Sequence, residues 1–266
     1  MELEPLLIPY ASEPHLGEGR ALIFSPHPDD EVLGCGGAIL AQSHRGQPVE
    51  VVVVTDGGGM VRDAETPAYV ALRREESRAA AALLGYGEPE FWDYPDRGLS
   101  PTPPLVERIR SRMERSRPRF VLTPSLYERH PDHLALSLAV IEAFRSTRLQ
   151  TALVFYEIGA PLHPNLLLDI SRFEERKRRA IACFRSQLAQ QDYARQVLAL
   201  NVFRTYTLPP GTRLAEAYLR LERDDLEGNP EATGIPSWHL CASLRRWEAA
   251  GNQDPLLDHW KGLLCS

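Results

Sequence analysis

One seven-residue stretch, Ser25-Pro26-His27-Pro28-Asp29-Asp30-Glu31, constrains the fold and the chemistry of this chain more than any other feature. It follows the short apolar run Ala21–Phe24, which is typical of a buried strand, and it precedes a segment typical of a helix. This order predicts a strand, a polar turn and a returning helix. The side chains of His27 and Asp30, three residues apart on such a turn, can direct two metal-ligating atoms to one point.

A second polar turn, His130-Pro131-Asp132-His133, follows the apolar run Phe120–Leu122. The two turns together supply two histidines and one carboxylate, namely His27, Asp30 and His133. Such a ligand set with open positions suits Zn²⁺ and also Fe²⁺. The competing interpretation is that the acidic residues only cap a helix N-terminus, where carboxylates are favoured by about 0.3–1 kcal/mol. Capping requires no histidines, so the pair of turns favours a metal site.

The remaining polar residues of the two turns predict catalytic roles. A metal ion lowers the pKa of a bound water from ~15.7 toward ~7, and Asp29 is the expected general base for that water. His130 is expected to donate to the developing oxyanion or to the leaving amine. Asp132 is expected to accept a hydrogen bond from the other nitrogen of His130 and fix its tautomer. Two simpler interpretations remain open, Asp132 as an N-cap and His130 as a surface turn residue.

Strand-like and helix-like segments alternate along the chain. The predicted strands cover residues 21–24, 48–55, 90–94, 120–123 and 152–158, and the predicted helices cover residues 32–43, 66–84, 103–115 and 134–144. This alternation predicts an α/β fold with a mostly parallel sheet, in which right-handed crossovers place every strand-to-helix loop at one edge. We therefore expect the turns at His27, Asp56, Asp96 and His130 to lie within reach of one another.

The chain is less regular after these segments. A charged helix is predicted after Ser171, through Lys177 to about residue 191, and its basic run Arg176–Arg179 is expected to be a solvated face. Residues 1–225 are assigned to one domain and residues 226–266 to a C-terminal helical extension. One apolar face of the extension is expected to pack on the body or on another subunit, which is compatible with a homo-oligomer. That face consists of Leu256, Leu257, Trp260, Leu263 and Leu264.

Composition narrows the function classes. A net charge of -6 and a pI near 5.8 argue against nucleic acid or an anionic membrane as the main partner. Residues 1–19 do not resemble a signal peptide, and no apolar run approaches the roughly 20 residues that span a bilayer. The four cysteines show no paired spacing, which predicts reduced thiols in a cytoplasmic protein.

The glycine-rich segment Gly34–Gly37 follows a strand, as a dinucleotide-binding loop does. It departs from the G-x-G-x-x-G pattern because Ile39 occupies the position of the third glycine. The carboxylates of Asp29, Asp30 and Glu31 would also repel a pyrophosphate at this helix start. These glycines therefore predict close packing of a helix on the sheet.

The two histidine turns resemble those of the PIG-L (LmbE-like) family of zinc-dependent sugar N-deacetylases, and the resemblance covers most of residues 20–220. The further matching segments are Thr55-Asp56-Gly57-Gly58, Arg73-Arg74-Glu75-Glu76, Leu84-Gly85, Pro95-Asp96, Tyr156-Glu157, Asp169-Ile170-Ser171, Lys177 and Ser186-Gln187. The resemblance implies a Rossmann-like three-layer α/β/α fold. It also implies hydrolysis of an N-acetyl group on an N-acetylglucosamine-type sugar or glycoconjugate, a small-molecule substrate.

The resemblance assigns roles to the residues of both turns. It places the metal ion on His27, Asp30 and His133, the general base at Asp29, and oxyanion support or the acid at His130. These are the roles that the residue types themselves favour.

The same resemblance implies that Arg73 and Asp96 face the glycan, and a guanidinium group and a carboxylate do suit sugar hydroxyls. Alternatively, Arg73 pairs with Glu76 on its own helix, and Asp96 only shapes its turn. Some members of the family place a mobile tyrosine just ahead of the second turn. In this chain Tyr127 lies three residues before His130.

Two other functions stay open at this point. The same site can cleave another N-acyl amide, such as an antibiotic or an amino-acid conjugate. Alternatively, the protein binds glycans without catalysis, through a vestigial site. Product analysis across N-acetyl, longer N-acyl and ureido substrates separates the first alternative from de-N-acetylation, and glycan binding without acetate release favours the second.

Overall fold

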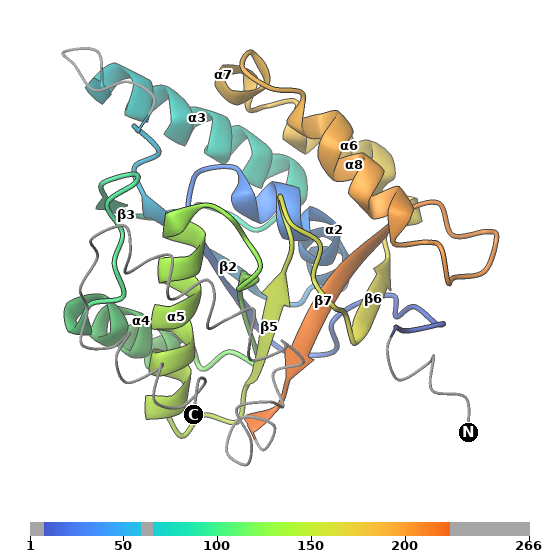
Figure 1. The fold of residues 1–266 in the computed structure, drawn as a ribbon, viewed down its shortest axis with the longest axis horizontal. Coiled ribbons are helices and arrows are strands. Elements are labelled where there is room, and N and C mark those ends of the chain that lie inside the picture. Colours follow the sequence, from blue (N-terminus) through green and yellow to red (C-terminus); the bar gives the residue numbers. More distant parts are fainter. Residues whose placement is uncertain (1–7, 60–65, 224–266) are drawn as a thin grey trace.

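The computed structural model describes residues 8–59 and 66–223, and these residues form a seven-stranded sheet flanked by helices (Figure 1). The strands lie in the order β3-β2-β1-β4-β5-β7-β6. Their bounds are β1 (Ala21–Ser25), β2 (Val49–Thr55), β3 (Glu90–Tyr94), β4 (Phe120–Pro124), β5 (Ala152–Tyr156), β6 (Leu166–Asp169) and β7 (Ala215–Leu221).

The first five strands of the chain pair in parallel, and β7 pairs antiparallel with both β5 and β6. Ala21 of β1 is in register with Val49 of β2 on one side and with Phe120 of β4 on the other. Strands covered on both faces are typically rich in β-branched residues, and Val51–Val54 of β2 is buried throughout. The predicted α/β fold with a mostly parallel sheet is confirmed.

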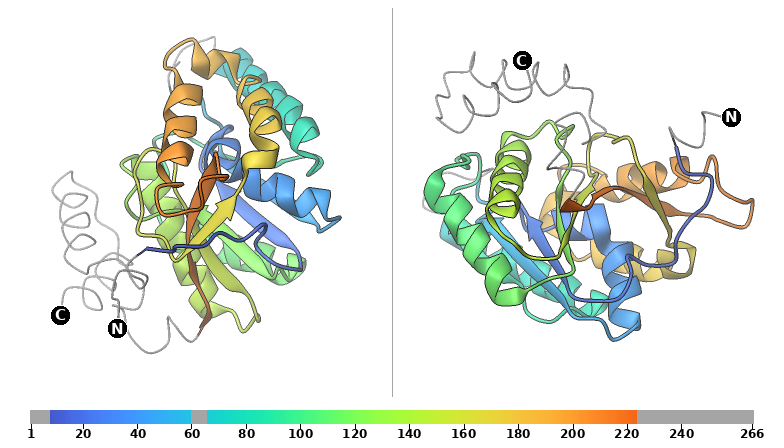
Figure 2. Two further views of the ribbon diagram at one scale, coloured as in Figure 1. Left: turned by 90° about the vertical axis from the view of Figure 1, so that its right-hand side faces the viewer. Right: turned by 90° about the horizontal axis from the view of Figure 1, so that it is seen from below.

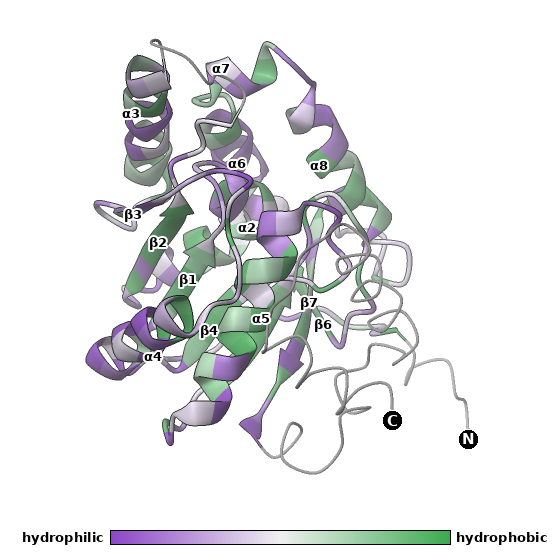
Figure 3. Ribbon diagram, turned by 60° about the vertical axis from the view of Figure 1, so that its left-hand side comes forward, coloured by the Kyte–Doolittle hydropathy of each residue, from purple (hydrophilic) through white to green (hydrophobic). Residues whose placement is uncertain are grey.

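Helices cover both faces of the sheet (Figure 2). Their bounds are α2 (Asp30–His44), α3 (Thr66–Leu84), α4 (Pro103–Ser116), α5 (Pro131–Ser146), η1 (Ser171–Phe173), α6 (Glu174–Ile181), α7 (Arg185–Leu188) and α8 (Tyr193–Phe203). Alternate residues of β2 show the layering, because Val52 and Val54 pack in the core with α4 and α5, whereas Val51 and Val53 pack in the core with α2 and α3. Hydrophilic residues dominate the outer sides of α3 and α4 (Figure 3).

The segment after β6 differs from the prediction of one long charged helix. It is divided into η1, α6 and α7, and the elements α8, β6 and β7 were not predicted. The expected solvated basic face is wrong for Lys177, which is fully buried, while Arg176, Arg178 and Arg179 are exposed. Lys177 faces α2, and its Nζ donates to Oε1 of Glu216 at 2.6 Å.

The glycine-rich start of α2 packs closely on the sheet, as expected. A Cβ on Gly34 would lie 2.3 Å from the ring of Tyr156, and a Cβ on Gly37 would lie 2.3 Å from a methyl carbon of Ile170. The helix leaves regular geometry at Cys35. This close approach positions the N-terminus of α2 at the carboxyl edge of the parallel strands.

Some predictions concern residues that the structure does not describe. The C-terminal extension 226–266 with its apolar face lies outside the described residues, as do Cys241 and Cys265. Within the described residues, Cys35 and Cys183 are free thiols. In that same part of the chain, no helix combines the length and the apolar character needed to cross a membrane.

Candidate active site

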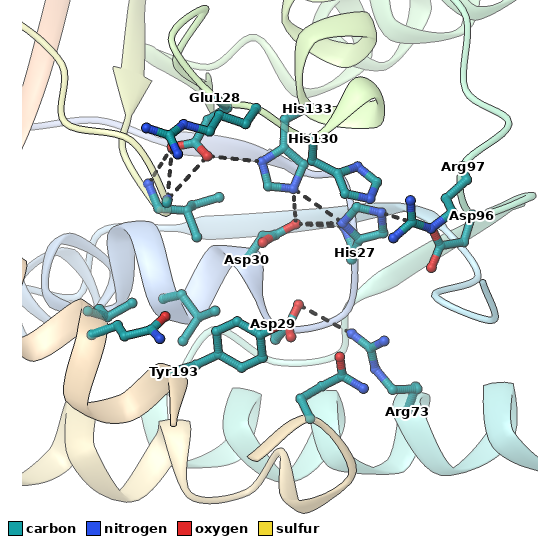
Figure 4. A pocket seen from close by; sticks show the side chains of 17 residues that line it. His27, Asp29, Asp30, Arg73, Asp96, Arg97, Glu128, His130, His133 and Tyr193 are labelled. Carbon is teal, nitrogen blue, oxygen red and sulfur yellow. Dashed lines mark hydrogen bonds and ion pairs between the residues drawn. The ribbon is translucent and has the colours of Figure 1, made fainter. Parts of the chain in front are cut away.

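A cavity of about 320 Å³ opens at the carboxyl edge of the parallel strands. The turns that follow β1, β3, β4 and β5 line one side of it, and side chains from α3, α7 and α8 line the other (Figure 4). The four polar turns expected to meet do meet here. Asp56 accepts the N–H of Asp96 at 3.1 Å, Asp96 approaches His27 to 3.4 Å, and the rings of His27 and His130 lie 4.6 Å apart.

The three predicted metal ligands converge on one point of the cavity. Oδ2 of Asp30 lies 3.0 Å from Nδ1 of His27 and 3.1 Å from Nε2 of His133, and these two nitrogens lie 3.3 Å apart. Donor atoms that are each about 2.1 Å from one ion, at angles between right-angled and tetrahedral, lie roughly 3.0–3.4 Å apart. The observed separations therefore fit a single ion of the size of Zn²⁺ or Fe²⁺.

The electrostatics of this cluster favour positive charge. Burial disfavours the charged imidazoles, but hydrogen bonds to Asp132, Asp30 and Asp96 raise the pKa of His27 well above its ordinary value. The pKa of His133 is raised to about 9 against the same burial, by the charge of Asp30 and a hydrogen bond to it. Burial alone would raise the pKa of Asp30, yet the charge of His133 holds it well below its ordinary value. A site that stabilises positive charge between these groups suits a cation.

A second donor cluster surrounds the other nitrogen of His27. The ligand atoms of His27, Asp96, His130 and Asp132 all lie within 4.8 Å of one another. Nε2 of His27 lies 3.1 Å from Oδ2 of Asp132, which also accepts the N–H of Arg97 at 2.7 Å. Because this carboxylate oxygen is already engaged by two donors, the cluster at Nδ1 of His27 is the better metal site.

The structure corrects the predicted partner of Asp132. The carboxylate of Asp132 was expected to fix the tautomer of His130, but it lies 4.0 Å from Nδ1 of His130 and bonds His27 instead. The backbone N–H of Asp132 donates to Nδ1 of His130 at 3.2 Å, so His130 is the N-cap of α5. This places the proton of the neutral His130 ring on Nε2, and Asp132 orients His27.

Glu128 is a functional candidate that the sequence interpretation missed. It is buried, and its Oε2 lies 3.5 Å from Nδ1 of His133, while Oε1 accepts the N–H of Ile158 at 2.7 Å. A carboxylate behind a ligating histidine orients the ring and raises its basicity. The available signal was the position of Glu128 in the short loop between β4 and α5, which leads into the second histidine turn.

Asp29 lies beside the predicted ligands with an unusual backbone conformation, φ 152° and ψ -30°. Strained backbone of this kind is concentrated at functional sites. Burial raises the pKa of Asp29 to about 7, although the positive charge of Arg73 opposes the rise. A carboxylate that titrates near neutral pH can both accept and return a proton under physiological conditions.

His130 keeps a neutral ring in this environment. It is half-buried, and burial together with the positive charges of His27 and His133 lowers the pKa of His130 to about 4. A neutral imidazole with its proton on Nε2 donates a hydrogen bond at pH 7 without carrying charge. This state suits oxyanion stabilisation better than proton transfer to a leaving amine.

Arg73 and Asp96 both line the cavity, but they differ in how far they are available to a ligand. Arg73 is only 3% exposed and does not pair with Glu76; it donates to the carbonyl oxygens of Pro28 at 2.8 Å and Gly57 at 3.1 Å. The Asp96 side chain is held by the N–H of Gly59, which donates to Oδ2 at 3.0 Å. The geometry thus favours a structural role for Arg73 and leaves a substrate contact open for Asp96.

Other cavity residues come from the helices after β6. Gln187 of α7, in the segment Ser186-Gln187 that resembles the family, lines the cavity together with Tyr193 and Gln196 of α8, for which there was no local sequence signal. Tyr193 lies on the side opposite the histidines (Figure 4). Tyr127 does not line the cavity within the described residues, and its ring packs against that of His163 at 5.9 Å.

Comparison with known proteins places this fold and site in a family. The family model described as GlcNAc-PI de-N-acetylase (PIG-L) matches residues 22–144. The chain is 32% identical over 197 residues to the diacetylchitobiose deacetylase of Thermococcus kodakarensis, which covers 67% of this chain and 74% of the relative. It is also 30% identical over 205 residues to the 4-oxalmesaconate hydratase of Pseudomonas putida, with 66% of this chain and 77% of the relative covered.

Among solved structures, the N,N'-diacetylchitobiose deacetylase from Pyrococcus horikoshii superposes with a TM-score of 0.71. The match covers 81% of this chain and 88% of that chain at 24% identity, and it shows a shared fold. The family model and the relative of 32% identity agree with each other and with the shared fold, and the chain belongs to the PIG-L (LmbE-like) family of GlcNAc-PI de-N-acetylases.

Proposed function

We propose that this protein is a metal-dependent hydrolase that removes the acetyl group from an N-acetylglucosamine-type sugar or glycoconjugate. The observation that carries the proposal is the convergence of His27, Asp30 and His133 within 3.3 Å of one another, beside Asp29 and His130 in one cavity. The deacetylase relative supports the reaction class, because it acts on an N-acetylated sugar by its name.

Zn²⁺ is the proposed ion, and Fe²⁺ is the alternative that the same donor set accepts. When bound by His27, Asp30 and His133, the ion supplies a Lewis acid for the acetamide carbonyl and lowers the pKa of water. Each of the two histidine rings has a carboxylate at its other nitrogen, which orients the ring. Asp132 lies 3.1 Å from Nε2 of His27, and Glu128 lies 3.5 Å from Nδ1 of His133.

Asp29 is the proposed general base. Its carboxylate takes a proton from the attacking water as the new C–O bond forms, and it then returns this proton to the nitrogen as the C–N bond breaks. The second proton of the water leaves the acetic acid as it ionises and is taken up by the amine, so the products are acetate and the ammonium form of the sugar and the proton count balances. A pKa near 7 suits both directions of this transfer.

His130 is the proposed oxyanion donor, through the Nε2 proton of its neutral ring. A single preorganised donor of this type contributes roughly 10²–10³ to kcat. Asp96 is proposed to accept hydrogen bonds from sugar hydroxyls at the same cavity wall. Arg73, which was expected beside the glycan, is proposed instead to position Asp29.

The hydratase relative supports a second candidate function, addition of water to a carbon–carbon double bond. Both reactions need an activated water and a nearby base, so the cluster alone favours neither. Amide hydrolysis is preferred because the matched family model and the first relative described are both de-N-acetylases.

The decisive experiment measures acetate release from a panel of N-acetylglucosaminides, including diacetylchitobiose. The protein is first treated with a chelator and then restored with Zn²⁺ or with Fe²⁺ under anaerobic conditions. Metal-dependent acetate release is the expected result, and the more active ion identifies the cofactor. Longer N-acyl sugars and N-acyl amino acids in the same panel define the amide that is cleaved. Hydration of 4-oxalmesaconate by the metal-loaded protein, without acetate release from any sugar, would establish the second function instead.

A further inference from the structure

Helix α2, which carries Asp30 in its first turn, is interrupted at Cys35. The backbone of Cys35 has φ -138° and ψ 23°, outside the helical region, so α2 consists of two helical pieces that meet at a kink. In a helix without proline, a kink can arise where a side chain enters the hydrogen-bond ladder. Two buried side chains from distant parts of the chain reach this kink, Lys177 of α6 and Glu216 of β7.

The two side chains engage a pair of backbone groups that bond each other in a regular α-helix, the carbonyl of residue 33 and the N–H of residue 37. Nζ of Lys177 donates to the Leu33 carbonyl oxygen at 3.0 Å, and Oε1 of Glu216 accepts the N–H of Gly37 at 2.7 Å. Lys177 and Glu216 bond each other at 2.6 Å. The ion pair therefore joins the two pieces of α2 from Leu33 to Gly37.

The glycine-rich segment of α2 makes room for this ion pair. A Cβ on Gly37 would lie 2.9 Å from the carboxyl carbon of Glu216, and a Cβ on Gly36 would lie 3.4 Å from Cγ of Lys177. A side chain at residue 37 would therefore displace the carboxylate from the kink. These glycines thus admit two charged side chains to the helix, in addition to the close packing of α2 on the sheet.

The same ion pair connects α2 to a helix on the opposite side of the cavity. A lysine ammonium group has three donors, and Lys177 has three acceptors within reach: the Leu33 carbonyl, Glu216, and Oδ1 of Asn201 at 3.0 Å. Asn201 belongs to α8, which supplies Tyr193 to the cavity. Helices α6 and α8 and strand β7 all pack on α2 (Figure 1). One buried ammonium group therefore relates α2 to α8.

The piece of α2 before the kink is a short turn that is bonded to Asp29. The N–H groups of Val32 and Leu33 both donate to the Asp29 carbonyl oxygen at 2.9 Å. The side chain of Leu33 also lines the cavity. A displacement of the Leu33 carbonyl would therefore pass through this one turn to Asp29, the proposed base, and to Asp30, a proposed metal ligand.

We propose that Lys177 and Glu216 are positioning residues for the reaction, because their ion pair fixes the turn that carries Asp29 and Asp30 relative to α8. The effect on activity rests on the proposed de-N-acetylase function. Neither side chain is among the described residues that line the cavity, so both act through the backbone of α2. Desolvation of the two charges offsets much of their attraction, so a buried ion pair need not raise stability, and here it specifies one arrangement of the backbone.

The first test is Lys177→Met, which removes the ammonium group and keeps an unbranched side chain. With full-length protein at saturating Zn²⁺, we expect kcat for acetate release to fall about 10- to 100-fold, because small displacements of a catalytic group cost this much. The assay temperature is one at which circular dichroism shows the variant to be folded. Ile109→Ala is the matched control, because Ile109 is fully buried in α4, away from the cavity. It is expected to lower stability and leave kcat nearly unchanged, and an equal fall in kcat for both variants would overturn the inference.

The double variant Lys177→Met with Glu216→Gln separates positioning from stability. It contains no unpaired buried charge at the kink, so part of the stability is expected to return. The Leu33 carbonyl and Asn201 still lack the ammonium group, and kcat is therefore expected to stay low. Recovery of kcat in step with the denaturation midpoint would show that the pair acts only through stability, and it would overturn the inference.

Amide hydrogen exchange tests the placement of the turn independently of the reaction. In Lys177→Met, the amides of residues 30–36 are expected to exchange about 10-fold or more faster, because a buried hydrogen bond that holds this segment is lost. The amides of α5 in the same protein serve as the internal reference. If no sugar is deacetylated, the proposed function fails, and this measurement decides the inference alone. Faster exchange confined to residues 30–36 supports it, whereas unchanged exchange, or equal acceleration in α5, overturns it.

Discussion

Nη2 of Arg73 lies 3.3 Å from Oδ1 of Asp29, and the same guanidinium group donates to the loops that follow β1 and β2. Arg73 therefore stabilises the strained turn that directs Asp29 into the cavity. Its positive charge also limits how far burial raises the pKa of the Asp29 carboxylate. Arg73, which was expected to contact the glycan, lines the cavity and is a neighbour of the proposed base.

The pH dependence of activity is the first consequence of this pair. A base must be deprotonated, so kcat/KM is expected to rise with pH and to level off above the pKa of Asp29. Burial raises that pKa to about 7, and the charge of Arg73 opposes the rise. A bound cation would oppose the rise in the same way. In Arg73→Gln the opposing charge is lost, the pKa rises, and the acidic limb moves to higher pH. We expect a loss of kcat/KM at pH 6 roughly 10-fold greater than at pH 8.5. An equal loss at both pH values would show that Arg73 acts only through folding.

Removal of the base separates catalysis from metal binding. Asp29→Asn is expected to retain the metal ion and to lower kcat by roughly 10²–10⁴-fold, because the carboxylate that accepts the proton is lost. His133→Ala, which removes a proposed ligand, is expected to lose both metal and turnover. Metal content by elemental analysis and acetate release from one sample check both variants. Near-normal turnover in a metal-replete Asp29→Asn protein would rule out Asp29 as the base.

The contact of Asp132 with His27 predicts a role in metal affinity. Asp132→Asn and Glu128→Gln keep the size of each side chain but remove the charge beside a histidine that is a proposed metal ligand. Substitutions of this kind typically lower metal affinity by 10–100-fold. Competition with a chromogenic zinc chelator measures the affinity, and excess Zn²⁺ is expected to restore part of the activity. Unchanged zinc affinity in both variants would mean that backbone contacts alone orient the two rings.

The buried Lys177–Glu216 pair predicts a large and localised effect on stability. Nζ of Lys177 donates to Glu216 at 2.6 Å, and Glu216 in turn accepts the N–H of Gly37 at 2.7 Å where α2 is kinked. Lys177→Met leaves a buried carboxylate without its partner, which typically costs about 3–5 kcal/mol of unfolding free energy. The neighbouring Arg178→Met replaces an exposed arginine and is expected to cost less than about 0.5 kcal/mol.

Chemical denaturation of both proteins measures this difference. The double variant Lys177→Met with Glu216→Gln is expected to recover part of the loss, because no buried charge then remains unpaired. A loss for Lys177→Met no larger than that for Arg178→Met would contradict a structural role for the pair.

The sequence by itself determined the order of elements in the parallel half of the sheet and the residues that meet at its edge. Alternating apolar runs and polar turns are local signals, and parallel strands joined by right-handed crossovers place their loops together. The clustering of His27, Asp30 and His133 follows from this topology, since His27 lies in the turn after β1 and Asp30 and His133 lie in the first turns of the helices that follow β1 and β4.

Only the tertiary structure decided which partner each polar side chain takes. The contacts of Asp132 with His27, of Arg73 with Asp29 and of Glu128 with His133 depend on side-chain directions within one crowded cavity. The burial of Lys177 and the antiparallel insertion of β7 depend on elements far apart in the chain. Hydrogen-bond distances are fixed by such long-range packing to within a few tenths of an ångström, and local sequence patterns carry no information at that scale.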